Sequence, residues 1–396
     1  MKGALFRRVP RWAWGLLVLA AGRPVHAQQL LDFQYVDSLS QTLLDQHRWL
    51  ALDSVGRAAL RLGTDYPALR RRLGAGALAR GRPAAALRYY GPALYQNPLD
   101  TAARAGLATA YLALNQPGPA ALLARELAGP QRQALGLASP RALTQVELEV
   151  LSLQTSVRQR GAGTYLRLGA SSRLSPRLGL TQNISYYTQD VEVPRPEVPG
   201  AFDWHRTSQG QYHALLTGQL APRWQAKGAF TYITKDFGSN YLGYLALAYT
   251  RPYWTVQAGA YAGVVTDTAR LQTDLRLTVY PLGNLRLYGF GRASLVASSR
   301  RTYPNALLGT GGRLRSWLWA EAWASAGPVP VLAELDGTYL YNLLDPLRRR
   351  AAASLLILGP RRLSLRLVYG AELRRIARIG VDYSLYSFSA TLAWTW

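Results

Sequence analysis

The chain has 396 residues and carries 46 Lys and Arg against 22 Asp and Glu, which gives a formal net charge of +24. It has no cysteine, which excludes disulfide bonds, thiolate metal sites and cysteine nucleophiles, and its four histidines argue against a histidine-based metal cluster. Beyond the N-terminal region no apolar run approaches the roughly 18 residues of a transmembrane helix, so a bundle of membrane-spanning helices is excluded.

Residues 1–27 have the pattern of a secretory signal peptide. A basic start is followed by an apolar stretch from Trp12 to Gly22 and by the small residues of Val25-His26-Ala27. The apolar stretch is too short to span a bilayer, which argues against the alternative of an uncleaved anchor. We therefore expect cleavage between Ala27 and Gln28 and export of the mature chain.

The region 28–145 has the apolar spacing of helices and repeats itself at an offset of 34 residues, so that His47, Gly81 and Asn115 occupy equivalent positions between helices. A helix–turn–helix period of this length is the tetratricopeptide signature, and about three such repeats are needed for a stable stack. The residues expected to pack the repeats together are Leu73, Gly74, Ala86, Tyr90, Ala93, Pro98, Leu107 and Ala120. The region is predicted to be a tetratricopeptide-like α-solenoid. Its concave face either binds a partner, which we favour, or the solenoid serves as a spacer or lid for the next domain.

From residue 163 to 396 the apolar period changes from 3.6 to 2. Along 269–279, for example, Leu271, Leu275 and Leu277 alternate with polar residues. Strict alternation predicts strands with one apolar and one polar face. Such strands form either a soluble sandwich or an outer-membrane barrel whose apolar face meets lipid. Most of the 24 Tyr and 11 Trp fall in this region, as expected for aromatic belts at a membrane interface.

The end of the chain favours the barrel. Apolar residues occupy every second position and the last residue is aromatic, which resembles the C-terminal assembly signal of bacterial outer-membrane barrels. The residues of this signal are Phe388, Leu392, Trp394 and Trp396. The resemblance implies outer-membrane lipid and the barrel assembly machinery as partners. The alternative, the edge strand of a soluble sheet, is disfavoured because a flat apolar edge invites aggregation.

Counting strands leaves a choice between 12 and 14, because single-chain bacterial barrels have an even number. Residues 146–162 are either a linker or an extra strand, and we favour 14 strands with 147–158 as the additional one. Longer loops are expected at 190–208, 235–240 and 298–305, and short turns near 174–177, 220–223, 251–252 and 281–284. The strand segments are predicted at 163–173, 177–189, 209–219, 223–234, 241–250, 253–264, 269–279, 285–297, 308–324, 331–343, 349–358, 362–372 and 383–396.

No catalytic, cofactor-binding or metal-binding residue is identified in the predicted barrel. His213 is expected to be a wall residue, and Asp203, His205 and Asp236 are expected on loops, where polar residues occur by chance. The candidate lumen charges are Arg270, Asp274, Arg276, Arg286, Arg292 and Arg366. They either form charge ladders that brace the interior, which we favour, or give a positively biased lumen that attracts anions. An exported membrane barrel is not expected to bind nucleic acid.

The order of signal peptide, tetratricopeptide repeats and barrel resembles YaiO-type outer-membrane proteins and the larger exporters of poly-N-acetylglucosamine and cellulose. The stretch from Glu334 to Asp345 looks like a late-strand pattern of YaiO-type barrels. The chain departs from the large exporters in having about three repeats and a smaller barrel. The resemblance implies a scaffold or port in exopolysaccharide secretion, biofilm formation or envelope biogenesis. It also implies a periplasmic protein partner for the repeats and an anionic or neutral polysaccharide as ligand, with no cofactor. The alternative is a barrel enzyme that acts on lipid or envelope glycan.

The sequence thus predicts α + β structure in separate domains, with an N-terminal α-solenoid and an antiparallel transmembrane barrel of 12–14 strands. It also predicts that the mature protein starts at Gln28 and fractionates with the outer membrane. N-terminal sequencing of the protein from outer-membrane fractions checks this. A chain that retains Met1 or washes off the membrane with carbonate would contradict the prediction.

Overall fold

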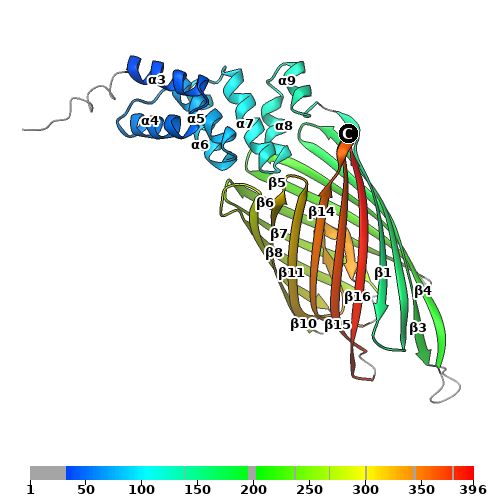
Figure 1. Ribbon diagram of the computed structural model, residues 1–396. Helices are drawn as coiled ribbons and strands as arrows, with labels where there is room; N and C mark the ends of the chain where they lie inside the picture. The colour runs from blue at the N-terminus through cyan, green and yellow to red at the C-terminus, as the bar shows by residue number, and fades with distance from the viewer. Residues whose placement is uncertain are drawn as a thin grey trace, which may run out of the picture.

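The computed structural model describes residues 33–138, 140–194, 202–235, 238–266, 268–298, 301–341, 345–376 and 379–396. An N-terminal group of helices lies at one end of a closed β-barrel (Figure 1). The predicted signal peptide and its junction between Ala27 and Gln28 lie outside the described residues.

The helices form three successive pairs with a constant spacing. Equivalent helices begin at residues 33, 67 and 101 and at residues 49, 83 and 117, so each pair is displaced by 34 residues from the last. None of the described helices combines the length and the apolar character needed to cross a membrane. The helices are α3 (Phe33–Asp45), α4 (Trp49–Arg61), α5 (Pro67–Ala79), α6 (Pro83–Gln96), α7 (Thr101–Ala113), α8 (Pro117–Ala124) and α9 (Gly129–Ala134).

The turn within each pair has the same backbone geometry. His47, Gly81 and Asn115 have φ angles of 55°, 65° and 55°. This left-handed region costs glycine nothing, and asparagine and histidine adopt it more often than other residues that carry a Cβ. The backbone geometry of the turn therefore repeats every 34 residues, although the residue type at this position changes.

The predicted packing residues lie between the helices. Ala86, Ala93 and Ala120 are fully buried, and burial raises the pKa of Tyr90 to about 12. Gly74 leaves room for the Tyr90 ring, because a carbon added at Gly74 would lie 2.7 Å from it. Leu73 and Leu107 are also buried, and Pro98 lies in the loop between α6 and α7.

One buried cation ties the first two helix pairs together. The Arg72 guanidinium donates to the Asp37 carboxylate at 2.6 Å, to Ser40 Oγ at 2.9 Å and to Gln41 Oε1 at 2.9 Å. The hydrogen bond from Arg72 holds the pKa of Asp37 below its ordinary value. The contribution of this carboxylate to stability is therefore present above its unfolded pKa and is lost as the pH falls through its folded pKa.

The barrel has 14 antiparallel strands, and β1 pairs with β16 to close the wall. The segment 146–162, left open between linker and strand, contains most of β1, so the barrel begins at Arg141 rather than at residue 163. The wall strands are β1 (Arg141–Thr155), β2 (Arg160–Ser175), β3 (Leu178–Pro194), β4 (Phe202–Ala221), β5 (Trp224–Lys235), β6 (Gly238–Arg251), β7 (Trp254–Val265), β8 (Thr268–Val279), β9 (Leu287–Ser298), β10 (Arg301–Arg315), β11 (Leu318–Val329), β14 (Leu347–Leu358), β15 (Leu363–Ile376) and β16 (Val381–Thr395).

Fourteen strands were favoured from the sequence, but two individual segments were wrong. The segment 308–324 is two strands, β10 and β11, because the chain turns at Ser316-Trp317 without a proline, glycine or asparagine to mark the turn. The segment 331–343 is not a wall strand at all, because it folds into the lumen as described below. The two errors cancel in the count.

Most of the expected long loops are also shorter than predicted. Pairing between β3 and β4 continues to Pro194 and Phe202, β5 and β6 reach Lys235 and Gly238, and β9 and β10 reach Ser298 and Arg301. Because about 9–11 residues suffice to cross a bilayer, the 17 residues of β3 and the 20 of β4 project beyond it.

The apolar residues of each strand point out of the barrel. Leu271, Leu275 and Leu277 are 46–55% exposed, whereas Gln272 between them is 4% exposed. On β16 the predicted assembly residues Phe388, Leu392, Trp394 and Trp396 are all exposed on the outer surface. A closed wall with no free edge and an apolar exterior is the architecture of an outer-membrane β-barrel.

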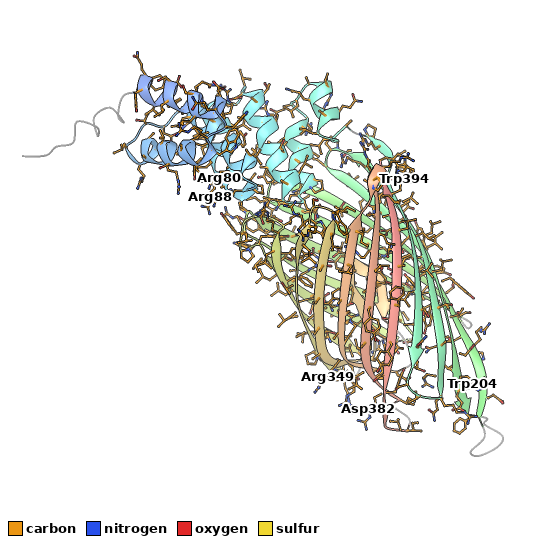
Figure 2. All side chains as sticks on the ribbon, in the orientation of Figure 1. Arg80, Arg88, Trp204, Arg349, Asp382 and Trp394 are labelled. Carbon is orange, nitrogen blue, oxygen red and sulfur yellow. The ribbon has the colours of Figure 1, made fainter. Side chains whose placement is uncertain are left out.

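The two ends of the barrel differ. Both ends of the barrel segment, at Arg141 and Trp396, lie beside the helices, and we call this the proximal end; Figure 2 shows Trp394 there and Arg349 and Asp382 at the opposite, distal end. The helices rest on proximal turns: Ala84 N donates to Gly283 O at 3.2 Å, and the Arg88 guanidinium lies 5.0 Å from the centre of the Tyr253 ring.

Replacing Trp394 and Trp396 by Asp should reduce the folded barrel several-fold more than Thr395→Asp. The tryptophans face lipid, where a charge costs up to about 2–4 kcal/mol at mid-depth and less near the rim, whereas Thr395 has the opposite parity on β16. The measurement is the heat-modifiable band on SDS gels of membrane fractions. Equal losses for the two kinds of variant would mean that the parity of β16 is wrong.

Candidate functional site

The segment between β11 and β14 leaves the wall at the distal end and folds into the lumen. Within it β12 (Leu332–Glu334) and β13 (Tyr339–Tyr341) pair with each other across a 3₁₀ turn, η1 (Leu335–Gly337), and not with any wall strand. The short strands are visible inside the barrel in Figure 1. We call residues 330–346 the plug, of which 330–341 and 345–346 are described.

The first arm of the plug fills space that the wall leaves empty. An eight-stranded barrel is filled by its own side chains, but the diameter grows with strand number, so a 14-stranded wall encloses more volume. Leu332 and Ala333 are buried, and Ala333 packs with Ile233 and Tyr261 of the wall. The Gln272 side chain accepts from Ala333 N at 3.0 Å and donates to Ala333 O at 2.8 Å. The wall thus supplies both hydrogen bonds that a neighbouring strand would give.

The tip of the plug is strained and held by one carboxylate. Leu335, Asp336 and Gly337 have φ angles of 50°, 60° and 94°, a region that costs a non-glycine residue about 1–3 kcal/mol. Asp336 receives Lys227 Nζ at 2.6 Å, Tyr244 Oη at 2.8 Å and Gln257 Nε2 at 2.8 Å. These three contacts from β5, β6 and β7 hold the tip in its strained conformation.

A second buried carboxylate joins the plug to the other side of the wall. Glu334 accepts from Arg292 Nη2 at 2.5 Å and from Arg350 Nη2 at 2.7 Å, and all three side chains are at least nine-tenths buried. Replacing one partner of such a group leaves an uncompensated buried charge, which costs about 3–5 kcal/mol. The plug is thereby fixed between β9 and β14.

The returning arm of the plug contacts β1 and β2. Tyr339 Oη donates to Glu149 at 2.5 Å, and the Arg167 guanidinium lies 5.4 Å from the centre of the Tyr339 ring. Arg167 also donates to Glu149 at 2.9 Å and forms an ion pair with Glu147. The plug therefore crosses the lumen from β5–β7 to β1–β2.

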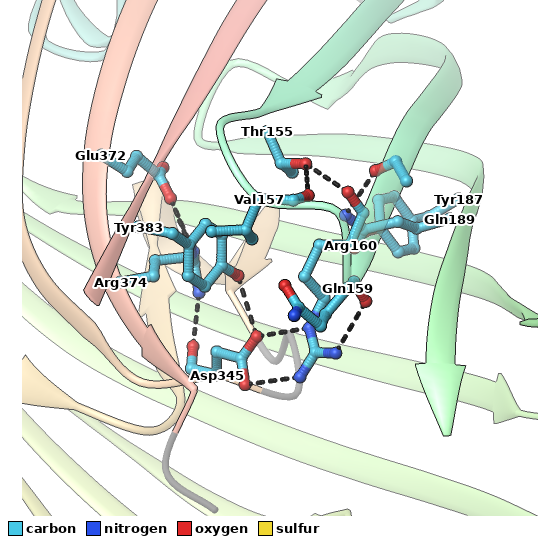
Figure 3. Close-up of polar contacts among 11 residues, drawn as sticks. Thr155, Val157, Gln159, Arg160, Tyr187, Gln189, Asp345, Glu372, Arg374 and Tyr383 are labelled. Atoms are coloured by element: carbon cyan, nitrogen blue, oxygen red, sulfur yellow. Dashed lines mark hydrogen bonds and ion pairs between the residues drawn. The ribbon is translucent and has the colours of Figure 1, made fainter. Parts of the chain in front are cut away.

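Asp345 anchors the plug at the distal mouth (Figure 3). Arg160 of β2 donates two hydrogen bonds to the Asp345 carboxylate at 2.6 and 2.9 Å, and Tyr383 Oη of β16 donates at 2.9 Å. Arg374 Nη1 of β15 donates to the Asp345 carbonyl at 2.7 Å and its Nε to Glu372 at 2.7 Å. The bidentate pairing fixes orientation as well as distance.

Beside the plug the lumen keeps a cavity of about 400 Å³, bounded by Leu335 and Asp336 of the tip and by wall residues. Its aromatic lining is Tyr165, Tyr187, Tyr244, Tyr261, Phe290, Trp323 and Tyr339. Its charged lining is nearly balanced, with six acidic residues (Glu149, Asp274, Glu321, Glu334, Asp336 and Glu372) and five arginines (Arg276, Arg292, Arg350, Arg366 and Arg374). This arrangement favours bracing charge ladders over a positively biased lumen.

The predicted lumen charges fall into three groups. Asp274, Arg276, Arg292 and Arg366 line the cavity. Arg270 has the inward parity of β8 but lies outside the cavity lining, nearer the distal end. Arg286 is a correction: it is exposed outside the lumen, because the turn after Val279 continues to residue 286 and β9 begins only at Leu287.

Several residues that hold the plug were missed from the sequence, namely Glu149, Arg160, Tyr339, Asp345 and Arg350. The segment was treated as a wall strand, and the stretch from Glu334 to Asp345 that looked like a late strand of YaiO-type barrels belongs to the plug. The dipeptide Asp336-Gly337 was an available signal, because it marks a hairpin turn in the middle of the supposed strand.

The histidines considered from the sequence as site candidates, His205 and His213, both lie on β4. His213 is 1% exposed, and its Nδ1 lies 2.8 Å from Thr231 Oγ1. Asp203 and His205, expected on a loop, lie on β4, and Asp236 falls outside the described residues. Among the described residues no three His, Asp or Glu side chains are grouped to hold a metal ion.

No protein-family model matches the chain, and no curated protein is detectably similar to it. Among solved structures, the Pseudomonas putida toluene transporter TodX is 10% identical with a TM-score of 0.43, over 65% of this chain and 90% of that chain. A bacterial polysaccharide outer membrane secretin is 9% identical with a TM-score of 0.42, over 65% and 100%. A Pseudomonas aeruginosa FadL homologue is 8% identical with a TM-score of 0.44, over 65% and 91%. At scores this low, none of these similarities carries an argument about function.

Lys227→Met should loosen the plug and raise the conductance of the barrel in planar lipid bilayers. The substitution leaves the buried Asp336 carboxylate without its cation, at a cost of about 3–5 kcal/mol, while the strain of the tip remains. The control is Arg206→Met at the distal rim, whose ion pair with Asp190 is exposed. Conductance that is unchanged both in Lys227→Met and after replacement of 330–346 by a short turn would show that the plug does not close the lumen.

Proposed function

We propose that the chain is an outer-membrane protein whose helical repeats lie in the periplasm and whose plugged barrel serves as a scaffold or port in exopolysaccharide secretion. The orientation is supported by the proximal end. Both ends of the barrel segment lie there, and the longest connection between wall strands, from β11 to β14, lies at the other end, as in bacterial barrels whose termini are periplasmic and whose longer loops are extracellular. The plug then belongs to the cell-surface side, between β11 and β14.

The cavity beside the plug carries the assignment of a glycan as ligand. Seven aromatic side chains line it, and the C–H groups of sugar rings pack well on aromatic faces. Gln209, Gln211, Gln257 and Ser387 supply neutral hydrogen-bonding groups among them. An aromatic wall with a few placed polar groups is typical of a ligand site, and the nearly balanced charge suits a neutral polymer better than an anionic one.

The helical region supports a partner-binding role. Its three helix pairs have the period and the left-handed turns at residues 47, 81 and 115 that a tetratricopeptide stack requires. Because α6 and α8 already rest near the barrel, the remaining surface is available to a periplasmic secretion partner. The alternative of a barrel enzyme gains no support from His213, whose bonded partner is a threonine hydroxyl rather than a carboxylate.

Replacing both Ala86 and Ala120 by Arg should unfold the repeats and abolish surface polysaccharide while the barrel still inserts. Both alanines are fully buried one repeat apart, so each arginine costs more than about 3 kcal/mol. The measurements are heat-modifiable barrel, protease resistance of the helical region and surface glycan in the same cells.

The matched control is Ala79→Arg with Ala113→Arg. These exposed alanines are also one repeat apart and end α5 and α7, where arginine suits the helix dipole. Surface glycan at the wild-type level in cells whose repeats are shown to be unfolded would refute the secretion role.

A further inference from the structure

Arginine occurs in or directly beside every turn at the proximal end of the barrel. Arg177, Arg223, Arg286 and Arg361 lie in the turns between β2 and β3, β4 and β5, β8 and β9, and β14 and β15, and Arg251 and Arg315 are the last residues of β6 and β10. None of these six turns contains an aspartate or a glutamate. Among the described residues these arginines make no ion pair with a carboxylate. The proximal rim is therefore a ring of one sign of charge.

The distal rim is built differently. There Arg206 pairs with Asp190 at 2.9 Å and Arg348 with Asp382 at 2.7 Å. Figure 2 shows Arg349 and Asp382 at this end and Trp394 at the other. Carboxylates therefore stand among the arginines of the distal rim, where Arg301 and Arg349 are also exposed, whereas the six proximal turns contain no aspartate or glutamate.

An aromatic belt lies on the outer wall directly below the proximal arginines. Trp224, Tyr249 and Trp254 on β5, β6 and β7 form a row with ring centres 4.7 and 5.7 Å apart. The Arg251 guanidinium lies 5.5 Å from the centre of the Tyr249 ring. Such belts mark the level of lipid headgroups, so the guanidinium groups above it lie at the level of the phosphates.

Three exposed arginines gather on one side of the rim. Arg315 ends β10, next to the turn that leads to β11, and Arg361 and Arg362 lie in the turn between β14 and β15. The two turns are neighbours, since β11 pairs with β14 and Leu358 N donates to Trp317 O at 2.7 Å. The helices instead contact the turns that contain Tyr253 and Gly283.

The turn between β14 and β15 is strained by its arginines. Arg361 and Arg362 have φ angles of 53° and 64°, a region that tight turns normally give to asparagine and glycine. The chain has 36 glycines yet places two consecutive cations here. Strain that a simple Asn-Gly sequence would relieve indicates that the guanidinium groups themselves are needed.

We propose that Arg315, Arg361 and Arg362 bind the phosphate headgroup of an anionic phospholipid in the leaflet that faces the helices. Guanidinium groups pair well with phosphate oxygens, and each basic residue near a charged membrane surface strengthens binding on the order of fivefold. A lipid is favoured over a soluble anion because outward-facing Leu314 and Leu363 continue the apolar wall directly below the site. The inference is independent of the proposed secretion role.

The test compares lipid binding by the full chain purified in a neutral detergent. Native mass spectrometry would score retained phosphatidylglycerol against phosphatidylcholine with the same acyl chains, with glycerol 3-phosphate as the soluble competitor. We expect the wild type to prefer phosphatidylglycerol, and the variant R315Q/R361Q/R362Q to lose at least about tenfold of that preference. The matched control R301Q/R348Q/R349Q removes three distal arginines and should retain the preference.

A second variant separates binding from stability. R361N/R362G gives the strained turn the residues that its backbone favours, so it should raise the heat-modifiability temperature while lowering the preference for phosphatidylglycerol. Equal losses in the proximal and distal variants would overturn the proposal, because they would show a charge effect without a site. Displacement of the lipid by glycerol 3-phosphate or by polyglutamate at equal concentration would assign the arginines to a soluble anion or an acidic partner and would also overturn it.

Discussion

The wall of a barrel in lipid must pair every backbone N–H and C=O within itself, so the wall has to close. The closed wall encloses a lumen that other residues must fill. Fourteen strands satisfy the backbone but enclose more volume than their inward side chains fill. One connection, of which residues 330–341 and 345–346 are described, is folded inward to occupy that volume. Its backbone cannot remain unpaired there, which explains why Gln272 bonds both polar groups of Ala333.

The plug is held by charge rather than by shape alone. Asp336, Glu334 and Asp345 each meet at least one cation from a different part of the wall, so the lumen is braced in three directions. Buried pairs of this kind contribute little net stability relative to apolar packing, but they penalise every alternative position strongly. The same contacts hold Leu335 and Asp336 in their strained backbone conformation. The tip would therefore relax if the Asp336 carboxylate lost its hydrogen-bonding partners.

The two ends of the barrel differ in how their charged residues are distributed. At the distal end some arginines pair with nearby carboxylates, as Arg206 does with Asp190 and Arg348 with Asp382, whereas the proximal turns contain no acidic residue and lie above an aromatic belt. The helices cover only part of that proximal rim, through Ala84 and Arg88. The helices thus contact one part of the ring of proximal turns, and the proposed lipid site occupies another part.

Local periodicity determined much of this protein from the sequence alone. The 34-residue spacing gave the helix pairs, and the alternation along β8 and β16 gave the correct faces, because lipid outside and polar groups inside impose opposite requirements on neighbouring residues. What sequence periodicity could not decide is whether an alternating segment joins the wall. Residues 331–343 alternate like a strand in sequence, but the described β12 and β13 within them pair with each other and not with a wall strand, and the turn at Ser316 has no proline, glycine or asparagine. Both depend on long-range pairing and on how much lumen volume remains after closure. The cluster around Asp336 follows from that volume, since Lys227, Tyr244 and Gln257 meet it only once the barrel has closed around the plug.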